Sequence, residues 1–415
     1  MDNLTHSLIG VTLGRSMRST SAARSRAAIW TAVIGNNFPD LDFLQSGLNG
    51  RFLSEGTMSY LLHHRGYSHT LVFAAIATPL IAWIGSFLGR DSKNWKSMVP
   101  LAFISLCLHM AADFLNNYGV HPFFPFNKNW FYGDTLFIVE PLLWFSLLPL
   151  AFLQLRNFIG RMIFLGAYAV VWGMIWLGPF FDLTFQLGLS AFGIFWLVWQ
   201  YRSKTPMPAW VGLIGVISSF SAIHHKTHAK LTHEFENGIR SEASEKLVDL
   251  VLTVSPGNPA CWNAWWVSVN AKKEMIARYG NWSWTPQFQA AATCHTQTTD
   301  SWAAPVRRPE LEIKNGKLTE AQSRTDLAIL GEYRGLLSEA EALAKKDCAF
   351  RQLLHFARIP FWDLNAQPPL AGDLRYDHGP KMSWAKVILG DPTQCLSNPP
   401  NWTPPNPLFV QMVDQ

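Results

Sequence analysis

Residues 63–89, HHRGYSHTLVFAAIATPLIAWIGSFLG, join a polar cluster directly to an apolar run of membrane length. The first eight residues include three histidines and an arginine, and the apolar part that follows carries no charged residue. About 20 apolar residues are what an α-helix needs to cross the hydrocarbon core of a bilayer. The stretch therefore predicts a spanning helix with ligand-type side chains at its entrance, and with Ser68 or Thr70 as its N-cap.

The composition of the whole chain predicts a membrane protein with a soluble domain attached. Of the 415 residues, 49% are hydrophobic and only 15% are charged. After two shorter stretches, apolar runs of similar length recur along the first half of the chain: 4–14 and 27–38, then 70–89, 98–117, 135–155, 158–178, 184–200 and 207–223. We therefore expect a mainly α fold, in which residues 1–223 form a polytopic helical membrane bundle of about six spanning helices and two short N-terminal helices. Residues 224–415 are expected to form a C-terminal extracytoplasmic α+β domain.

Basic residues in the short connections predict how the chain is oriented in the membrane. They fall in alternate connections: Arg15, Arg18, Arg24 and Arg26, then Arg90, Lys93 and Lys96, then Arg156 and Arg161, then Arg202 and Lys204. Loops rich in lysine and arginine stay on the cytoplasmic side. The opposite, outer side then receives residues 63–69, residues 118–134 and the whole C-terminal domain.

Four of the five cysteines lie in the C-terminal domain, which agrees with an oxidising compartment. These are Cys261, Cys294, Cys348 and Cys395, and they allow three disulfide pairings between which the sequence does not choose. A zinc site built from them is not favoured, because no CxxC pair occurs. Within this domain we expect helices at about 228–249 and 326–347, and strands around 262–270 and 281–285.

Polar side chains also occur where lipid or apolar packing makes them costly. In LCLHMAADFLNN, residues 106–117, His109, Asp113 and Asn116 have i, i+4, i+7 spacing and lie on one helical face. In NNFPDLDFL, residues 36–44, a proline breaks the preceding helix and presents Asp40, with Asp42 as a second candidate. The i, i+4 spacing of His109 and Asp113 suits two ligands on one metal ion.

Three further segments bring ligand-type residues to the same outer end of the bundle. His6, His64 and His69 precede or enter helices there, and Asp134 and Glu140 stand at the outer end of the run 135–155. Each residue also has a structural reading, as a helix cap or as a buried hydrogen-bonded pair. Convergence of five separate segments on one membrane face favours a metal site.

Motifs in a fixed order give the chain a family resemblance. They are MDNLTH (1–6), NFPDLDF (37–43), HHRGYSHT (63–70), HMAADFLNNYG (109–119), PFFPFN (122–127) and GDTLFIVEP (133–141). The chain resembles the membrane-bound metal-dependent hydrolase family, whose members are also described as LexA-binding, inner-membrane-associated or YdjM-like hydrolases. The likeness covers about residues 1–145 by motif and extends more loosely to SPGNPACWNAWWV, FARIPFWDLN and GDLRYDHG in the C-terminal domain.

The resemblance implies a site in a bacterial inner membrane protein, facing the periplasm or exterior. The implied metal ligands are His6, Asp40, His64, His69, His109 and Asp113, and the accompanying catalytic residues are Arg65, Asn116, Asp134 and Glu140. The family is in turn similar to helical zinc-dependent phospholipases C and single-strand nucleases. This sequence departs from the family pattern at Glu140, where an aspartate is expected, and at Ser68, where a threonine is usual.

Mixed imidazole and carboxylate ligands predict a divalent metal, with Zn²⁺ favoured and one to three ions expected. Such an ion lowers the pKa of a bound water from about 15.7 towards 7, so hydrolysis is the expected chemistry. Arg65 is expected either to clamp a phosphate or carboxylate, or to pair with Asp42.

The location of the predicted site at a membrane face favours a membrane lipid or lipid-linked phosphoester as substrate. No nucleic-acid partner is expected, because the net charge of +5 is modest and spread over short loops. Two alternatives remain at this point. One is a membrane-anchored binding or regulatory scaffold, and the other is a transporter, although transporter sites usually lie near the bilayer midplane.

Overall fold

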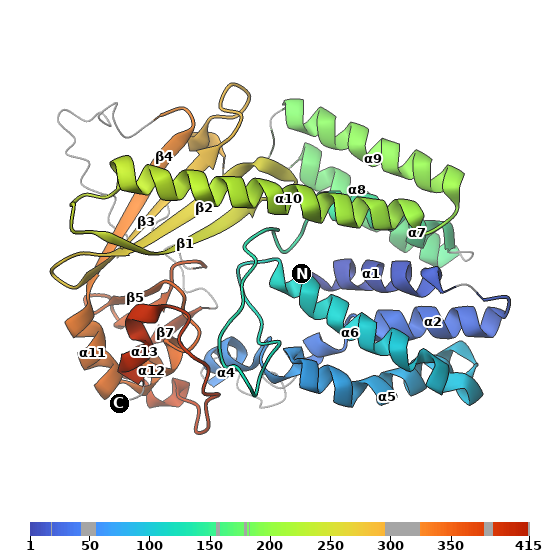
Figure 1. The fold of residues 1–415 in the computed structure, drawn as a ribbon, viewed down its shortest axis with the longest axis horizontal. Coiled ribbons are helices and arrows are strands. Elements are labelled where there is room, and N and C mark those ends of the chain that lie inside the picture. The colour runs from blue at the N-terminus through green and yellow to red at the C-terminus, as the bar shows by residue number, and fades with distance from the viewer. Residues whose placement is uncertain are drawn as a thin grey trace.

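The computed structural model describes residues 1–17, 19–42, 55–154, 158–177, 181, 183–294, 324–376 and 385–413. A helical bundle lies beside a domain that contains the sheet, and the long helix α10 runs along both (Figure 1). The expectation of a mainly helical fold with a C-terminal α+β part is therefore confirmed.

The first half of the bundle contains four helices that pack side by side. They are α1 (Asn3–Ser16), α2 (Ala22–Gly35), α5 (Leu71–Gly89) and α6 (Val99–Phe114), with the short α4 (Glu55–His63) preceding α5. Glycines let α2 and α5 approach closely, since a Cβ on Gly89 would lie 2.3 Å from the Cα of Ala27. Thr70 caps α5 by accepting the N–H of Phe73 at 3.0 Å, whereas Ser68 bonds elsewhere.

The second half of the bundle contains α7 (Pro141–Gln154), α8 (Phe158–Trp176), α9 (Leu183–Ser203) and α10 (Met207–Glu234). Helix α7 packs against α9, α10, α8 and α1, so it joins the two halves. The domain boundary expected after residue 223 lies inside α10, which continues to Glu234 and then forms a π-turn over Phe235–Ile239.

Five helices of the described part are long and apolar enough to cross a membrane. These are Leu71–Gly89, Ser92–Phe114, Phe158–Trp176, Leu183–Ser203 and Met207–Ile239. Their outward faces are apolar and exposed, as at Ile76 and Ile163, which is typical of surfaces that contact lipid. The run 135–155 was expected to be a sixth span, but residues 135–140 are not helical and α7 has only 14 residues. At 1.5 Å per residue, such a helix covers about 21 Å of a hydrocarbon core of about 30 Å.

The C-terminal domain is built on two antiparallel sheets. Strands β1 (Lys246–Ser255), β2 (Asn258–Val269), β3 (Glu274–Ser283) and β4 (Leu327–Leu336) pair in sequence order, and α10 crosses this sheet in Figure 1. Strands β5 (Pro360–Asp363), β6 (Leu370–Asp373) and β7 (Lys386–Ile388) form the second sheet, beside α11 (Leu337–Lys346), α12 (Cys348–Leu353) and α13 (Val410–Val413).

Two expected helices of this domain are partly wrong. Residues 246–249 belong to β1, because the run KLVDLVLTVS is rich in aliphatic and β-branched residues that suit a half-buried strand. Residues 327–336 form β4, which pairs with β3 and buries alternate side chains such as Tyr333. The expected strands around 262–270 and 281–285 are found as β2 and the end of β3.

The disulfides are Cys261–Cys294 and Cys348–Cys395. The first pair joins β2 to the turn after β3, and the second joins α12 to the segment after β7. The structure thus selects one of the three pairings that the sequence left open.

Candidate metal centre

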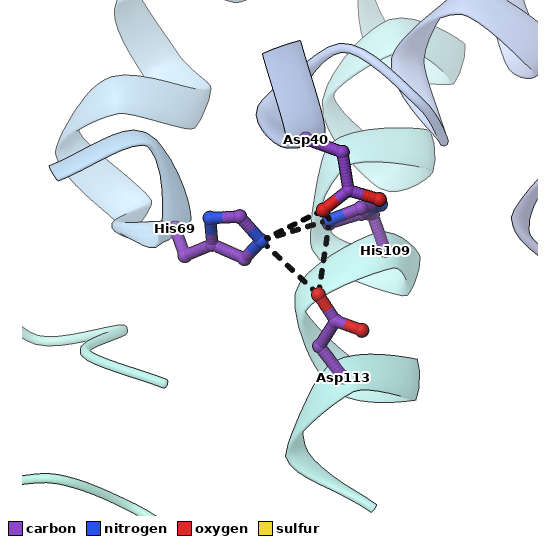
Figure 2. A group of neighbouring side chains, drawn as sticks. All are labelled: Asp40, His69, His109 and Asp113. Carbon is purple, nitrogen blue, oxygen red and sulfur yellow. Dashed lines mark hydrogen bonds and ion pairs between the residues drawn. The ribbon is translucent and has the colours of Figure 1, made fainter. Parts of the chain in front are cut away.

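Four ligand-type side chains from three segments meet at the C-terminal end of α6 (Figure 2). Asp40 comes from the 3-10 turn Pro39–Asp42, His69 comes from the 3-10 turn Tyr67–His69, and His109 and Asp113 come from successive turns of α6. One nitrogen or carboxylate oxygen from each residue lies within 4.8 Å of the others, and all four side chains are buried. We call these four residues the metal group.

The ligand atoms of the metal group lie close enough together to share one cation. The Nε2 atoms of His69 and His109 are 3.0 Å apart, and Asp113 Oδ2 lies 3.0 Å and 3.2 Å from them. Asp40 Oδ1 lies 3.5 Å from each Nε2. Two nitrogens and two carboxylate oxygens that face one point are a donor set that zinc and related divalent ions accept.

The orientation of His109 is fixed from the side opposite the metal group. Its Nδ1 lies 2.7 Å from the carbonyl oxygen of Asn36, at the end of α2. Because a carbonyl only accepts, Nδ1 must be the donor and, in the neutral ring, Nε2 carries the lone pair. The lone pair therefore points into the metal group. The part that Asn36 plays could not be predicted from the sequence, since a backbone acceptor leaves no signal in residue type.

His6 lies directly against the metal group, as the sequence predicts. Its ring stacks on the ring of His109 with 3.9 Å between centroids. Its Nε2 is 3.2 Å from Asp113 Oδ1 and 4.0 Å from Asp40 Oδ2. The amino nitrogen of Met1 also contacts Asp113 Oδ1. Thus one oxygen of Asp113 faces His69 and His109, and the other faces α1.

The structure places His64 outside the metal group. Its Nδ1 lies 2.8 Å from Asp42 Oδ1, and its ring centroid is 6.1 Å from that of His69. His64 therefore pairs with Asp42 instead of joining the metal group. Arg65, which follows it, has a positive φ of 58°.

Arg65 reaches α6 instead of pairing with Asp42 through its side chain. Its Nη2 lies 2.9 Å from Asp113 Oδ1, and its Nη1 donates to Asn116 Oδ1 at 2.8 Å. The guanidinium carbon lies 5.0 Å from the ring centre of Tyr118. Only the backbone N–H of Arg65 donates to Asp42 Oδ2, at 3.0 Å. Arg65 therefore contacts Asp113 directly, and Asn116 helps to hold the Arg65 guanidinium in place.

The buried carboxylates also affect His69 electrostatically. Burial alone favours the neutral ring, but hydrogen bonding to Asp113, Asp40 and Asp42 outweighs burial and raises the pKa of His69 to about 10. A concentration of negative charge that holds a proton on His69 is also one that attracts a cation.

Asp134 and Glu140 lie at contacts with the C-terminal domain and are not brought to the metal group. Asp134 Oδ2 accepts a bond from Arg358 Nη1 at 2.7 Å, and burial raises the pKa of this carboxyl. Glu140 accepts the N–H of Gly257 at 3.1 Å, and burial raises its pKa to about 7. Both residues join residues far apart in the chain, so the structure gives them a role in holding the two parts together.

Taken together, the fold and the metal group describe a multi-pass membrane protein with a buried His/Asp cluster that can hold a metal ion. Residues 1–180 match the family model described as YdjM inner membrane protein. This match confirms the YdjM-like resemblance over residues 1–180. The name of the family gives a membrane location and no reaction.

One relative is an uncharacterized protein of Bacillus subtilis (strain 168), YfhP. The chain is 23% identical to it over 154 residues, which are 35% of this chain and 44% of YfhP. The chain therefore spans less than half the length of that relative. No solved structure matches the chain.

Proposed function

We propose that this protein is an integral-membrane metal-dependent hydrolase that acts on a phosphoester or lipid-linked substrate at the outer membrane face. The observation that carries the proposal is the metal group, in which Asp40, His69, His109 and Asp113 place their ligand atoms within 4.8 Å of one another in a buried position. Buried charges and imidazoles in a membrane bundle are costly and usually have a function.

The donor set favours Zn²⁺. Asp113 Oδ2 faces the two imidazole nitrogens, while Oδ1 faces His6 and Arg65. Asp40, His69, His109 and Asp113 are therefore the residues that would hold the ion. A divalent cation held by these ligands would supply Lewis acidity and an activated water for hydrolysis.

The positive charge of Arg65 supports an anionic substrate. Asp40 and Asp113 together balance one divalent cation, and Arg65 adds a further positive charge beside Asp113. Among the described residues, the buried Nε of Arg65 and Nδ2 of Asn116 have no hydrogen-bond partner. These two donors suit a phosphoryl oxygen.

Exposed apolar side chains beside the ligands support a lipid-linked substrate. Leu41 follows Asp40 and is 48% exposed, and Tyr67 lies two residues before His69 and is 46% exposed. The exposed surface continues through Leu71 onto the outward face of α5. An amphiphile in the adjoining leaflet would thus meet apolar surface next to the ligands.

The proposed outer location of the site rests on two further observations. Basic residues concentrate in the loops at the other ends of the helices, which the positive-inside rule assigns to the cytoplasm. The two disulfides lie in the domain on the side of the metal group, and disulfides persist in oxidising compartments.

Metal analysis of the purified protein tests the proposal. The wild type is expected to contain stoichiometric zinc or another transition metal, and His109→Ala and Asp113→Ala are expected to lose it. His233→Ala serves as a matched control, because His233 is exposed near the end of α10 and lies beside Asn237, away from the metal group. Wild-type protein without bound transition metal would overturn the proposal. A screen of phosphoesters and phospholipids with the loaded protein then identifies the bond that is cleaved.

The position of the metal group argues against transport as the function. His109 and Asp113 lie in the last two turns of α6, at the end of the span Ser92–Phe114. Transporter sites usually lie near the middle of the bilayer, on broken helices. The scaffold alternative differs in its expectation that substitutions in the metal group leave cellular function unchanged.

A further inference from the structure

A second set of polar contacts, outside the metal group, meets on the carboxylate of Asp42. Oδ1 lies 2.8 Å from His64 Nδ1, and Oδ2 accepts the hydroxyl of Ser68 at 2.6 Å. Oδ2 also accepts the backbone N–H of Arg65 at 3.0 Å and lies 3.4 Å from His69 Nδ1. Asp42 is therefore surrounded by donors from the segment 64–69, and its side chain is only 7% exposed.

The direction of the hydrogen bonds can be worked out from the donors and acceptors available. An ionised carboxylate only accepts, so the single hydroxyl proton of Ser68 is used in the bond to Asp42. Ser68 Oγ lies 2.9 Å from His69 Nδ1 and must act there as the acceptor. His69 therefore donates from Nδ1, and in the neutral ring its Nε2 carries the lone pair that faces the metal group.

We infer that Asp42 is a positioning residue of the metal centre, which sets the tautomer of His69 through Ser68 and holds His64 away from the ligand positions. This inference rests on the proposed function only in requiring that the metal group binds a metal. The Asn36 carbonyl fixes the tautomer of His109 by a direct hydrogen bond, and Asp42 fixes the tautomer of His69 through Ser68. Carboxylates behind a ligating histidine fix its ring and increase its basicity.

A purely structural reading gives Asp42 the role of a brace between the turns Pro39–Asp42 and Tyr67–His69. The substitution Asp42→Asn separates the two readings. An asparagine has the size of aspartate, but its amide group is a donor and faces either His64 or the pair Ser68 and Arg65. In the second case Ser68 becomes free to donate to His69 Nδ1, which favours the tautomer with a proton on Nε2.

The experiment measures zinc affinity by chelator competition and the visible absorption spectrum of the Co²⁺-substituted protein. Asp42→Asn is expected to lower zinc affinity by about 10- to 100-fold and to change the Co²⁺ spectrum. Asp91→Asn is the control, because Asp91 accepts from Asn94 at 2.7 Å at the other end of α5 and is expected to leave both unchanged.

Ser68 supplies a second pair of variants in case Asp42→Asn fails to fold. Ser68→Ala removes the hydroxyl between Asp42 and His69 and is expected to lower zinc affinity, whereas Ser68→Thr keeps the hydroxyl and is expected to restore it. An asparagine whose amide faces His64 still accepts the Ser68 hydroxyl, so the decisive variant is Ser68→Ala. Wild-type affinity and spectrum in Ser68→Ala would overturn the positioning role while the metal site itself stands. A wild type that binds no metal would overturn the proposed function and this inference together.

Discussion

Replacing Arg358 by methionine tests the ion pairs that join the membrane part to the C-terminal domain. The Arg358 guanidinium donates to Asp134 in the loop before α7 and to Asp249 in β1, with Nη1–Oδ2 and Nε–Oδ2 distances of 2.7 and 2.6 Å. It also lies 4.5 Å from the ring centre of Tyr132. Methionine keeps much of the apolar contact with this ring and removes the charge.

The expected cost follows from the burial of the carboxylate that loses its partner. The side chain of Asp134 is 7% exposed, and its other oxygen, Oδ1, has no hydrogen-bond partner among the described residues. Removing one member of a buried ion pair costs about 3–5 kcal/mol, because the other charge stays buried and uncompensated. Asp249 is 21% exposed and can recover some hydration. We therefore expect Arg358→Met to lower the free energy of unfolding by about 3–5 kcal/mol.

A matched control comes from Arg324, which also bridges two carboxylates. It bonds to Glu234 and Asp326, both at 2.7 Å, but its side chain is 44% exposed. Surface ion pairs of this kind contribute about 0–1 kcal/mol, so Arg324→Met is expected to have a small effect.

Equilibrium unfolding of the purified variants in mixed micelles compares the two substitutions. Adding Asp134→Asn to Arg358→Met should recover part of the loss, since the unpaired charge is then removed. Equal losses in the two arginine variants, or a further loss in the double variant, would refute the reasoning.

Three other predictions address the stability of the fold. The pKa of Glu140 in the folded protein is about 7, above its ordinary value of 4.5, so the folded state holds a proton that the unfolded state releases between these values. Stability should therefore fall by about 3 kcal/mol as the pH rises from 4.5 to 7, and unfolding of Glu140→Gln against pH should lack this decline. Replacing Cys348 and Cys395 by serine opens a loop with a sequence separation of 47 residues and should lower the free energy of unfolding by about 4 kcal/mol. Equilibrium unfolding of the variant beside the wild type measures this loss, and an unchanged transition would contradict it. Gly89→Ala should cost about 1–3 kcal/mol through overlap with α2, whereas Gly166→Ala meets no atom within 4 Å and should be neutral, so similar thermal melts for the two would contradict the close packing.

Local patterns were sufficient to predict much of the metal group. The i, i+4 spacing of His109 and Asp113 depends only on helix geometry, and the proline before Asp40 predicts the end of α2. His69 could be predicted as a ligand because it lies directly before a long apolar run. These signals act over a few residues, so the sequence contains them directly.

Residues whose partners lie far away in the chain could not be assigned in the same way. Asp134 looks like a site residue because it stands at the end of an apolar run, but its partner, Arg358, is 224 residues away. Glu140 likewise depends on the backbone N–H of Gly257, which has no residue-type signature. The placement of His64 also depends on its contact with Asp42, which lies 22 residues earlier in the chain and which no local sequence pattern indicates.

The contacts between the two parts of the chain also determine which experiment can separate their functions. Trp402 Nε1 donates to the carbonyl of Leu62 at 2.7 Å, just before the turn that carries His69, and Arg375 Nη1 donates to the carbonyl of Asn117 at 2.6 Å, just after α6. The C-terminal domain thus holds the chain just before His69, at Leu62, and just after Asp113, at Asn117. A truncation after residue 223 would remove these contacts and also cut α10 before its end at Glu234. Because such a chain would lose site geometry together with the domain, point substitutions at the metal group and at the interface are the informative test of whether the domain assembles the site or acts by itself.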